Sequence, residues 1–262
     1  MVGKTAIEAL ARVPAEVSVA SEFRYCDPIF APGDLAVFIT QSGETADTLA
    51  ALRLTKSRGI PTLAIVNVVG SSIAREADFV LYTHAGPEIA VASTKAYTVQ
   101  VALMMLFAVR LGLANGRLAE ERARAMTAAL LGSPALAEEA LRSAEPVKKL
   151  AARFQNAHDL FFIGRALDYA LSLEGSLKLK EISYIHSEAY AAGELKHGTI
   201  SLVTKGTPVI ALMTQPALAE KMISNIREVS TRGAEVLLIH GAQTAVPEGL
   251  ADHADCRPHT ER

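Results

Sequence analysis

The stretch GDLAVFITQSGETADTLAALRLTKSRGIPTLAIVN, residues 33–67, decides the fold because it has the pattern of a strand, a helix and a second strand. Its apolar runs, LAVFIT (35–40) and TLAIVN (62–67), are continuous and not alternating. Such runs are typical of parallel strands that helices cover on both faces. The segment between them, 44–57, has the length and composition of a helix. The sequence therefore predicts a parallel α/β unit.

Similar short runs rich in Val, Ile and Leu recur along the chain and alternate with helical patterns. Further strands are expected at 17–20, 78–83, 159–164, 208–213 and 235–240. Further helices are expected at 5–13, 93–111, 118–131 and 166–185. This alternation predicts the α/β class.

The strand-helix-strand unit occurs twice. GTPVIALMTQPALAEKMISNIREVSTRGAEVLLIHG, residues 206–241, aligns with the first stretch when one extra residue is allowed. The pair Thr40-Gln41 then falls on Thr214-Gln215. We therefore expect two α/β lobes of similar topology, related by an internal repeat.

The expected division is a first lobe over 1–115, a helical connection over 116–150 and a second lobe over 151–262. The chain opens on a helical pattern, whereas a doubly wound domain normally opens on a strand, and it closes on the polar DHADCRPHTER (252–262). We therefore expect the first lobe to lack its first strand and the second lobe to lack its C-terminal end.

Composition argues against several classes of partner. The formal net charge is −2 and Trp is absent, so neither nucleic acid nor an anionic membrane surface is expected. The most membrane-like run, VALMMLFAV (101–109), is shorter than the roughly 20 residues of a spanning helix and is expected to be a buried helix. The N-terminus lacks an apolar signal core, and Cys26 and Cys256 lack metal-ligand spacing. We expect a cytoplasmic protein with no metal and no cofactor.

Hydroxyl side chains crowd the exit of the strand expected at 35–40. In parallel α/β sheets, ligands bind beyond the carboxyl ends of the strands, where helix N-termini present free amides. Gly43 permits a close backbone approach, and Thr40, Ser42 and Thr45 add hydrogen-bond donors, which suits a phosphate monoester. A Walker lysine and the three glycines of a dinucleotide loop are absent, which argues against a nucleotide.

A second interpretation is that Ser42 only caps the following helix, with Glu44 and Asp47 opposing the helix dipole. The repeat favours ligand binding, because TQSGETAD in the first copy becomes TQPALAEK in the second, so the fold does not need the hydroxyls. Glu44 is expected to point away from a phosphate, which it would repel. In GPEIAVASTKAYT (86–98), Ser93 can likewise cap a helix or bind a ligand.

The densest chemistry lies in LEGSLKLKEISYIHSEAYAAGELKHGT, residues 173–199. Lys178 and Glu181 are three residues apart and share a helix face. In a cleft, such a carboxylate can transfer a proton while the ammonium stabilises developing negative charge. The pair can also be an ordinary helix ion pair. Lys180 is turned away from this face and is expected in solvent.

A glycine-supported turn is expected after this helix. The small residues AAG after Tyr190 are expected to break the helix and to bring Glu194, Lys196 and His197 into the turn. A lone histidine in a turn is also compatible with a plain surface role. No metal site is expected, because the histidines lack zinc-ligand spacing.

Four motifs together resemble the isomerase half of the glutamine-fructose-6-phosphate aminotransferase family, which is built of two sugar isomerase (SIS) domains. They extend over nearly the whole chain and are ASEFRY (20–25), QSGETADTLAALRL (41–54), EIAVASTKAYT (88–98) and LEGSLKLKEISYIHSEAYAAGELKHG (173–198). The resemblance implies two doubly wound parallel-sheet SIS lobes, each a flavodoxin-like three-layer sandwich.

The resemblance also implies an activity and a site. The family makes glucosamine 6-phosphate from fructose 6-phosphate with ammonia that a separate domain releases from glutamine. Positions that would bind the sugar phosphate are Thr40, Gln41, Ser42, Thr45 and Ser93. Glu181 would move the proton between sugar carbons 1 and 2, Lys178 would support the intermediate, and His197 would open the sugar ring across a homodimer interface.

The chain departs from the family pattern in several places. Thr40 replaces the usual serine, and Thr199 replaces the usual proline after KHG. The glutaminase domain, the first strand with its Cys-Gly-Thr-Ser turn and the tail with the imine-forming lysine have no counterpart here, so the chain is expected to be an internal fragment of a synthase. Two alternatives stay open: a non-catalytic sugar-phosphate sensor, and a deaminase or ketose isomerase of the same superfamily.

Overall fold

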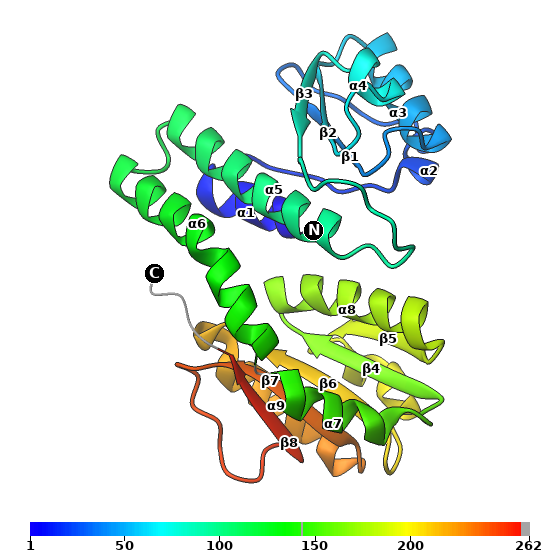
Figure 1. Cartoon of the computed structure of the whole chain (residues 1–262), viewed down its shortest axis with the longest axis vertical. Helices are drawn as coiled ribbons and strands as arrows, with labels where there is room; N and C mark the ends of the chain where they lie inside the picture. The colour runs from blue at the N-terminus through cyan, green and yellow to red at the C-terminus, as the bar shows by residue number, and fades with distance from the viewer. Residues whose placement is uncertain (143, 258–262) are drawn as a thin grey trace. The chain divides into compact units, whose positions relative to one another are not determined.

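Two compact units make up the chain, one formed by Ala6–Leu118 and the other by Met1–Thr5 together with the residues from Ala119 onward. The computed structural model describes residues 1–142 and 144–257 (Figure 1). Each unit contains a parallel sheet with helices packed against it. The predicted α/β class with two parallel-sheet lobes is therefore confirmed.

The sheet of the Ala6–Leu118 unit has three parallel strands in the order β1-β2-β3. They are β1 (Ala36–Thr40), β2 (Thr62–Val66) and β3 (Phe79–Tyr82), all at expected places. The strand expected at 17–20 is wrong, because α2 (Ala20–Phe23) begins there and the preceding residues have no regular structure. A run of β-branched residues forms a strand only beside a partner strand, and the described sheet offers it none.

Helices cover both faces of this sheet. On one face, α3 (Ala46–Ser57) and α4 (Ser72–Glu76) bury a cluster around Phe38, Leu52 and Ile73. On the other, α1 (Val2–Leu10) and α5 (Lys95–Ala114) contribute to a cluster with Ile65 of β2. The result is the expected three-layer arrangement.

The apolar run at 101–109 lies within α5 and is helical, as expected. Among the described residues, α5 is the one helix long and apolar enough to cross a membrane, by length and composition only. Only 28% of its most apolar stretch is buried, because packing with α1 and Ile65 covers one side of the helix. The expectation of a buried helix is therefore only partly right.

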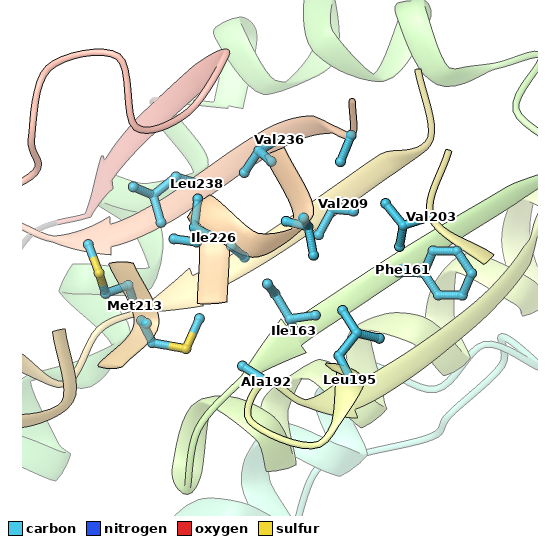
Figure 2. Close-up of a cluster of buried hydrophobic side chains, with 14 of the residues drawn as sticks. Phe161, Ile163, Ala192, Leu195, Val203, Val209, Met213, Ile226, Val236 and Leu238 are labelled. Atoms are coloured by element: carbon cyan, nitrogen blue, oxygen red, sulfur yellow. The ribbon is translucent and has the colours of Figure 1, made fainter. Parts of the chain in front are cut away.

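The second unit contains a five-stranded parallel sheet in the order β5-β4-β6-β7-β8. The strands are β4 (Asp159–Gly164), β5 (His186–Ala191), β6 (Pro208–Met213), β7 (Glu235–Gly241) and β8 (His253–Arg257). Figure 2 shows the core that forms where β4, β6 and β7 meet Ile226 of α9 (Ala219–Thr231). The strands expected at 159–164, 208–213 and 235–240 are confirmed.

Two strands of this sheet were not expected. The helix α8 (Leu167–Ser183) ends before Tyr184, whose left-handed φ of 61° turns the chain into β5, so the expectation that AAG after Tyr190 breaks the helix is wrong. β8 lies in the polar stretch expected to contain no strand. Both are edge strands with one neighbour each, so they do not need the apolar sequence of a central strand.

The remaining helices connect the sheets. The region expected to be helical after residue 116 contains α6 (Glu120–Arg142) and α7 (Ala144–Phe154). In the described part of the chain, short 3₁₀ helices lie at Leu195–His197, Thr199–Leu202 and Pro216–Leu218. The internal repeat is confirmed in space, because β1-α3-β2 and β6-α9-β7 are both parallel strand-helix-strand units.

Asp78 connects the amino ends of two strands to α3. Its carboxylate accepts hydrogen bonds from the backbone N–H and the hydroxyl of Thr62, at 2.9 and 2.7 Å, and pairs with Lys56 at 2.8 Å. The contact with Lys56, followed by those with Thr62, lowers the pKa of Asp78 from 3.8 to about 2. Its ionised form therefore stabilises the fold above pH 3.8, and this stabilisation is lost as the pH falls toward 2.

We expect Asp78→Asn to lower the urea midpoint of unfolding near neutral pH and to weaken the dependence of that midpoint on pH between 3.8 and about 2. Urea titrations of both proteins across this range measure the effect. Two midpoint curves that stay parallel throughout would contradict it.

Candidate functional site

The carboxyl end of β1 and the loop that follows it carry four of the residues expected to bind a ligand. Thr40 is the buried last residue of β1, and its Oγ1 accepts a hydrogen bond from Gly43 N at 3.2 Å. Ser42 Oγ accepts one from Glu44 N at 3.3 Å. The N-cap position of α3 belongs to Thr45, so the interpretation that Ser42 caps this helix is wrong.

The segment after β2 and the first turn of α4 fix the backbone of this loop. Asn67 N donates to Gln41 O at 3.2 Å, and Ile73 N donates to Gly43 O at 3.1 Å. Gly43 has a φ of +71°, and a Cβ atom there would lie 2.3 Å from the hydroxyl oxygen of buried Ser71. Glycine is therefore required at this position by both conformation and space.

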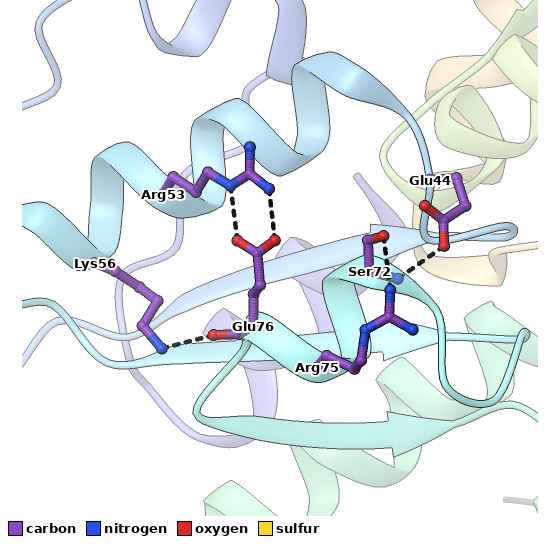
Figure 3. Close-up of polar contacts among 6 residues, drawn as sticks. All are labelled: Glu44, Arg53, Lys56, Ser72, Arg75 and Glu76. Atoms are coloured by element: carbon purple, nitrogen blue, oxygen red, sulfur yellow. Dashed lines mark hydrogen bonds and ion pairs between the residues drawn. The ribbon is translucent and has the colours of Figure 1, made fainter.

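Glu44 is engaged with α4. Its Oε1 accepts a hydrogen bond from Ser72 N at 2.8 Å, as Figure 3 shows. The hydrogen bonds from Ser72 hold the pKa of Glu44 below its ordinary value, and the charge of Arg75 adds to this effect. The same helix is tied to α3 by Glu76, which accepts two hydrogen bonds from Arg53 (Figure 3).

Ser93 lies just before α5, on a different segment from the loop at 40–45. Its hydroxyl donates to Glu88 Oε2 at 3.0 Å, and the same oxygen accepts a hydrogen bond from Ala96 N at 3.2 Å. Thr94 takes the N-cap position of α5 without a side-chain hydrogen bond, and Glu88, not Ser93, accepts the bond from the first turn of the helix. A glutamate several residues before a helix gives no local sequence signal of this role.

Lys178 and Glu181 lie together on α8, as predicted. Lys178 Nζ is 2.6 Å from Glu181 Oε2 and 3.5 Å from Glu174 Oε1, and all three side chains are partly buried. Burial opposes the charged form of Lys178, but the hydrogen bond and the charges of the two glutamates outweigh it and raise the pKa of Lys178 above its ordinary value. The structure adds Glu174, which the sequence could have revealed by its spacing of four residues from Lys178. Lys180 is exposed, as expected.

His197 ends the 3₁₀ helix Leu195–His197, and Gly198 follows with a φ of 139°. The buried side chains of Ala192 and Leu195 anchor this turn in the core (Figure 2). The His197 side chain is exposed, and no hydrogen-bond partner for its imidazole is found within residues 1–142 and 144–257. The predicted turn is therefore present, with its histidine accessible.

The corresponding strand exit in the second lobe is occupied by the protein's own carboxylate. Thr214 donates from its backbone N–H and from its hydroxyl to buried Asp168, at 2.9 and 2.5 Å. Gln215 donates to Arg165 O at 2.9 Å. In the second copy the backbone N–H and the hydroxyl of Thr214, which aligns with Thr40, are therefore satisfied by Asp168 without a polar loop.

No group of three or more His, Cys, Asp or Glu side chains that could hold a metal ion occurs among the described residues. The sequence predicts hydrogen bonding to a ligand at the exit of β1 and proton transfer at the Lys178–Glu181 pair, and the structure describes the geometry of both groups.

Two parallel α/β lobes built on a repeat, with a hydroxyl-rich strand exit in one and a partly buried lysine-glutamate pair in the other, define a class of repeated-lobe α/β proteins. Residues 1–110 and 153–260 match the SIS domain, and the chain belongs to this family.

Comparison with individual proteins identifies similar aminotransferases. The chain is 57% identical to glutamine–fructose-6-phosphate aminotransferase [isomerizing] of Clostridium tetani, over 237 residues that make up 90% of this chain and 39% of that protein. It superposes on the C-terminal domain of glucosamine-fructose-6-phosphate aminotransferase from Francisella tularensis with a TM-score of 0.95 and 39% identity, covering 98% of this chain and 73% of that one. These similarities confirm the resemblance seen in the sequence.

A more distant structure shares the fold. Glucosamine-6-phosphate deaminase from Thermotoga maritima has a TM-score of 0.75 and 23% identity, covering 98% of this chain and 74% of that one. The chain spans about two-fifths of the length of the curated relatives that it matches.

Proposed function

We propose that this chain is the sugar-phosphate isomerase region of a glutamine-fructose-6-phosphate aminotransferase. It binds fructose 6-phosphate and glucosamine 6-phosphate, and in the intact enzyme it interconverts ketose and aldose while nitrogen is added. The observation that carries the proposal is the fixed, hydroxyl-lined loop at the exit of β1, in a chain with aminotransferases as relatives. The names of these relatives favour this function over a sensor, and the deaminase supports the fold alone.

The phosphate lies at the start of α3 in this proposal. Ser42 and Thr45 donate to it from their hydroxyls, together with free N–H groups of the first helical turn. Gln41 and Ser93 bind the sugar. Thr40 contributes by accepting the hydrogen bond from Gly43, which holds the loop in its binding conformation.

Proton transfer belongs to the pair on α8. Glu181 removes a proton from carbon 1 of the open-chain ketose and returns it to carbon 2, and the Lys178 ammonium stabilises the negative charge that develops on the oxygen between these steps. The raised pKa of Lys178 supports this role, because the side chain stays charged through neutral pH.

His197 opens the sugar ring, and we propose that it does so in a second copy of the chain within a homodimer. The exposure of its side chain supports such a contact, since an unengaged imidazole is free to reach a neighbouring molecule. A cytoplasmic location follows from the proposed role in sugar-phosphate metabolism.

Calorimetric titration with glucosamine 6-phosphate tests the binding proposal. We expect Ser42→Ala combined with Thr45→Ala to weaken binding by about 10- to 100-fold, because two hydrogen bonds to a charged group are removed. Ser57→Ala is the control: Ser57 lies at the other end of α3, and its hydroxyl donates to Leu54 O of the same helix.

The proposal fails for this chain if the unaltered protein binds no hexose phosphate at millimolar concentration. Ammonia release from glucosamine 6-phosphate would favour a deaminase instead. Binding without any hydrogen exchange at carbon 1 in deuterated water would favour a sensor.

A further inference from the structure

Asn67 follows directly after β2 and is bonded to the exits of both neighbouring strands. Its backbone N–H donates to Gln41 O, in the loop after β1, at 3.2 Å. Its side-chain Oδ1 accepts hydrogen bonds from Thr83 Oγ1 at 3.0 Å and from Ala85 N at 2.9 Å, both after β3. Its Nδ2 donates to Gly86 O at 2.7 Å. One residue therefore joins three strand exits.

These bonds assign the orientation of the side-chain amide. Two donors, from Thr83 and Ala85, point at Oδ1, and the Gly86 carbonyl accepts from Nδ2. If the amide were flipped, its NH₂ group would face these two donors and its oxygen would face the Gly86 carbonyl oxygen. No aspartate or leucine of similar size can make all three side-chain contacts. Asparagine is therefore required at position 67 for the side-chain contact with the segment after β3.

The two segments joined by Asn67 lead to the two parts of the proposed binding site. The loop after β1 carries Ser42 and Thr45, and the segment after β3 continues through Glu88 to Ser93. Among the described residues, no hydrogen bond joins Ser93 directly to the loop at 40–45. The distance between the phosphate-binding and the sugar-binding hydroxyls thus depends on the residue that links their segments.

Resting on the proposed function, we infer that Asn67 is a positioning residue for the hexose phosphate. It acts through the loops and has no need to touch the ligand. Its backbone N–H fixes the phosphate-binding loop, and its side chain fixes the segment leading to Ser93. Precise placement of two hydrogen-bonding loops is a precondition for binding both ends of one ligand.

The test compares Asn67→Ala with Asn115→Ala in the full chain. Asn115 follows α5 in the same unit, and its Nδ2 donates to Ala11 O at 2.6 Å, so the control also loses a side-chain amide that binds a backbone carbonyl. Dissociation constants for glucosamine 6-phosphate and for inorganic phosphate are measured by calorimetry, and the urea midpoint is measured for each variant.

We expect Asn67→Ala to weaken glucosamine 6-phosphate binding by about 10-fold or more and inorganic phosphate binding by less, because the backbone bond to Gln41 survives the substitution. Asn67→Asp keeps the two contacts of Oδ1 but turns a carboxylate oxygen toward Gly86 O, so it is also expected to weaken glucosamine 6-phosphate binding. Asn115→Ala is expected to change the urea midpoint without changing either dissociation constant.

A folded Asn67→Ala variant that binds glucosamine 6-phosphate as the unaltered protein does would overturn the inference while leaving the proposed function intact. Equal losses of affinity in Asn67→Ala and Asn115→Ala would also overturn it, because they would indicate a general loss of stability. An unaltered protein that binds no hexose phosphate would remove the proposed function, and the inference with it.

Discussion

Replacement of Glu181 by glutamine is expected to slow hydrogen exchange at carbon 1 of fructose 6-phosphate by about 10²- to 10⁴-fold, because an amide cannot take up the proton that a carboxylate removes. Glutamine is nearly isosteric, and its carbonyl oxygen can still accept a hydrogen bond from Lys178, which lies 2.6 Å from the present carboxylate. The fold and the binding of the sugar phosphate should therefore persist. Deuterium uptake from deuterated water, followed by NMR, measures the rate.

Lys180→Gln provides the matched control for Glu181→Gln. Lys180 lies on the same helix but is exposed, so its substitution changes one charge on α8 and leaves the Lys178–Glu181 ion pair unaltered. The control should exchange hydrogen at the unaltered rate. A Glu181→Gln variant that binds the sugar phosphate and exchanges carbon-1 hydrogen as fast as the control would exclude Glu181 as the base.

The central strands were predictable because burial on both faces leaves a continuous apolar run. β2 is buried at every position, and TLAIVN shows this directly in the sequence. β5 and β8 were missed because each is paired on one side only, and their polar residues resemble loops. The strand predicted at 17–20 is the opposite error. These residues have the composition of a strand, but the described sheet offers them no neighbouring strand.

The site was predictable where its chemistry depends on local spacing. Lys178 and Glu181 are separated by one helical turn, so their contact follows from helix geometry alone. The contacts of Asn67 with Ala85 and of Thr214 with Asp168 join segments that are distant in the chain. No periodicity encodes such pairs, because they depend on which strands become neighbours in the sheet.

Substitution of Gly43 by alanine is expected to lower the free energy of unfolding by about 2–4 kcal/mol and to weaken glucosamine 6-phosphate binding by more than about 10-fold. The new Cβ would lie 2.3 Å from Ser71 Oγ and 2.9 Å from Ile73 Cγ2, two buried groups with little room to move. The φ of +71° adds backbone strain for any residue with a Cβ. Relief of the contact requires the loop to move away from α4, which displaces Ser42 and Thr45.

Gly59→Ala separates the two causes of this loss. Gly59 has a similar φ of +74°, but nothing lies within 4 Å of the added Cβ, so alanine there introduces the backbone strain without the steric contact. It should cost about 1 kcal/mol and leave the affinity for glucosamine 6-phosphate unchanged. Urea denaturation and calorimetry on both variants measure the difference. Equal stability losses in the two variants would mean that the loop accommodates the Cβ added by Gly43→Ala without a steric cost. Retained affinity in Gly43→Ala would show that the sugar phosphate binds to a different conformation of this loop.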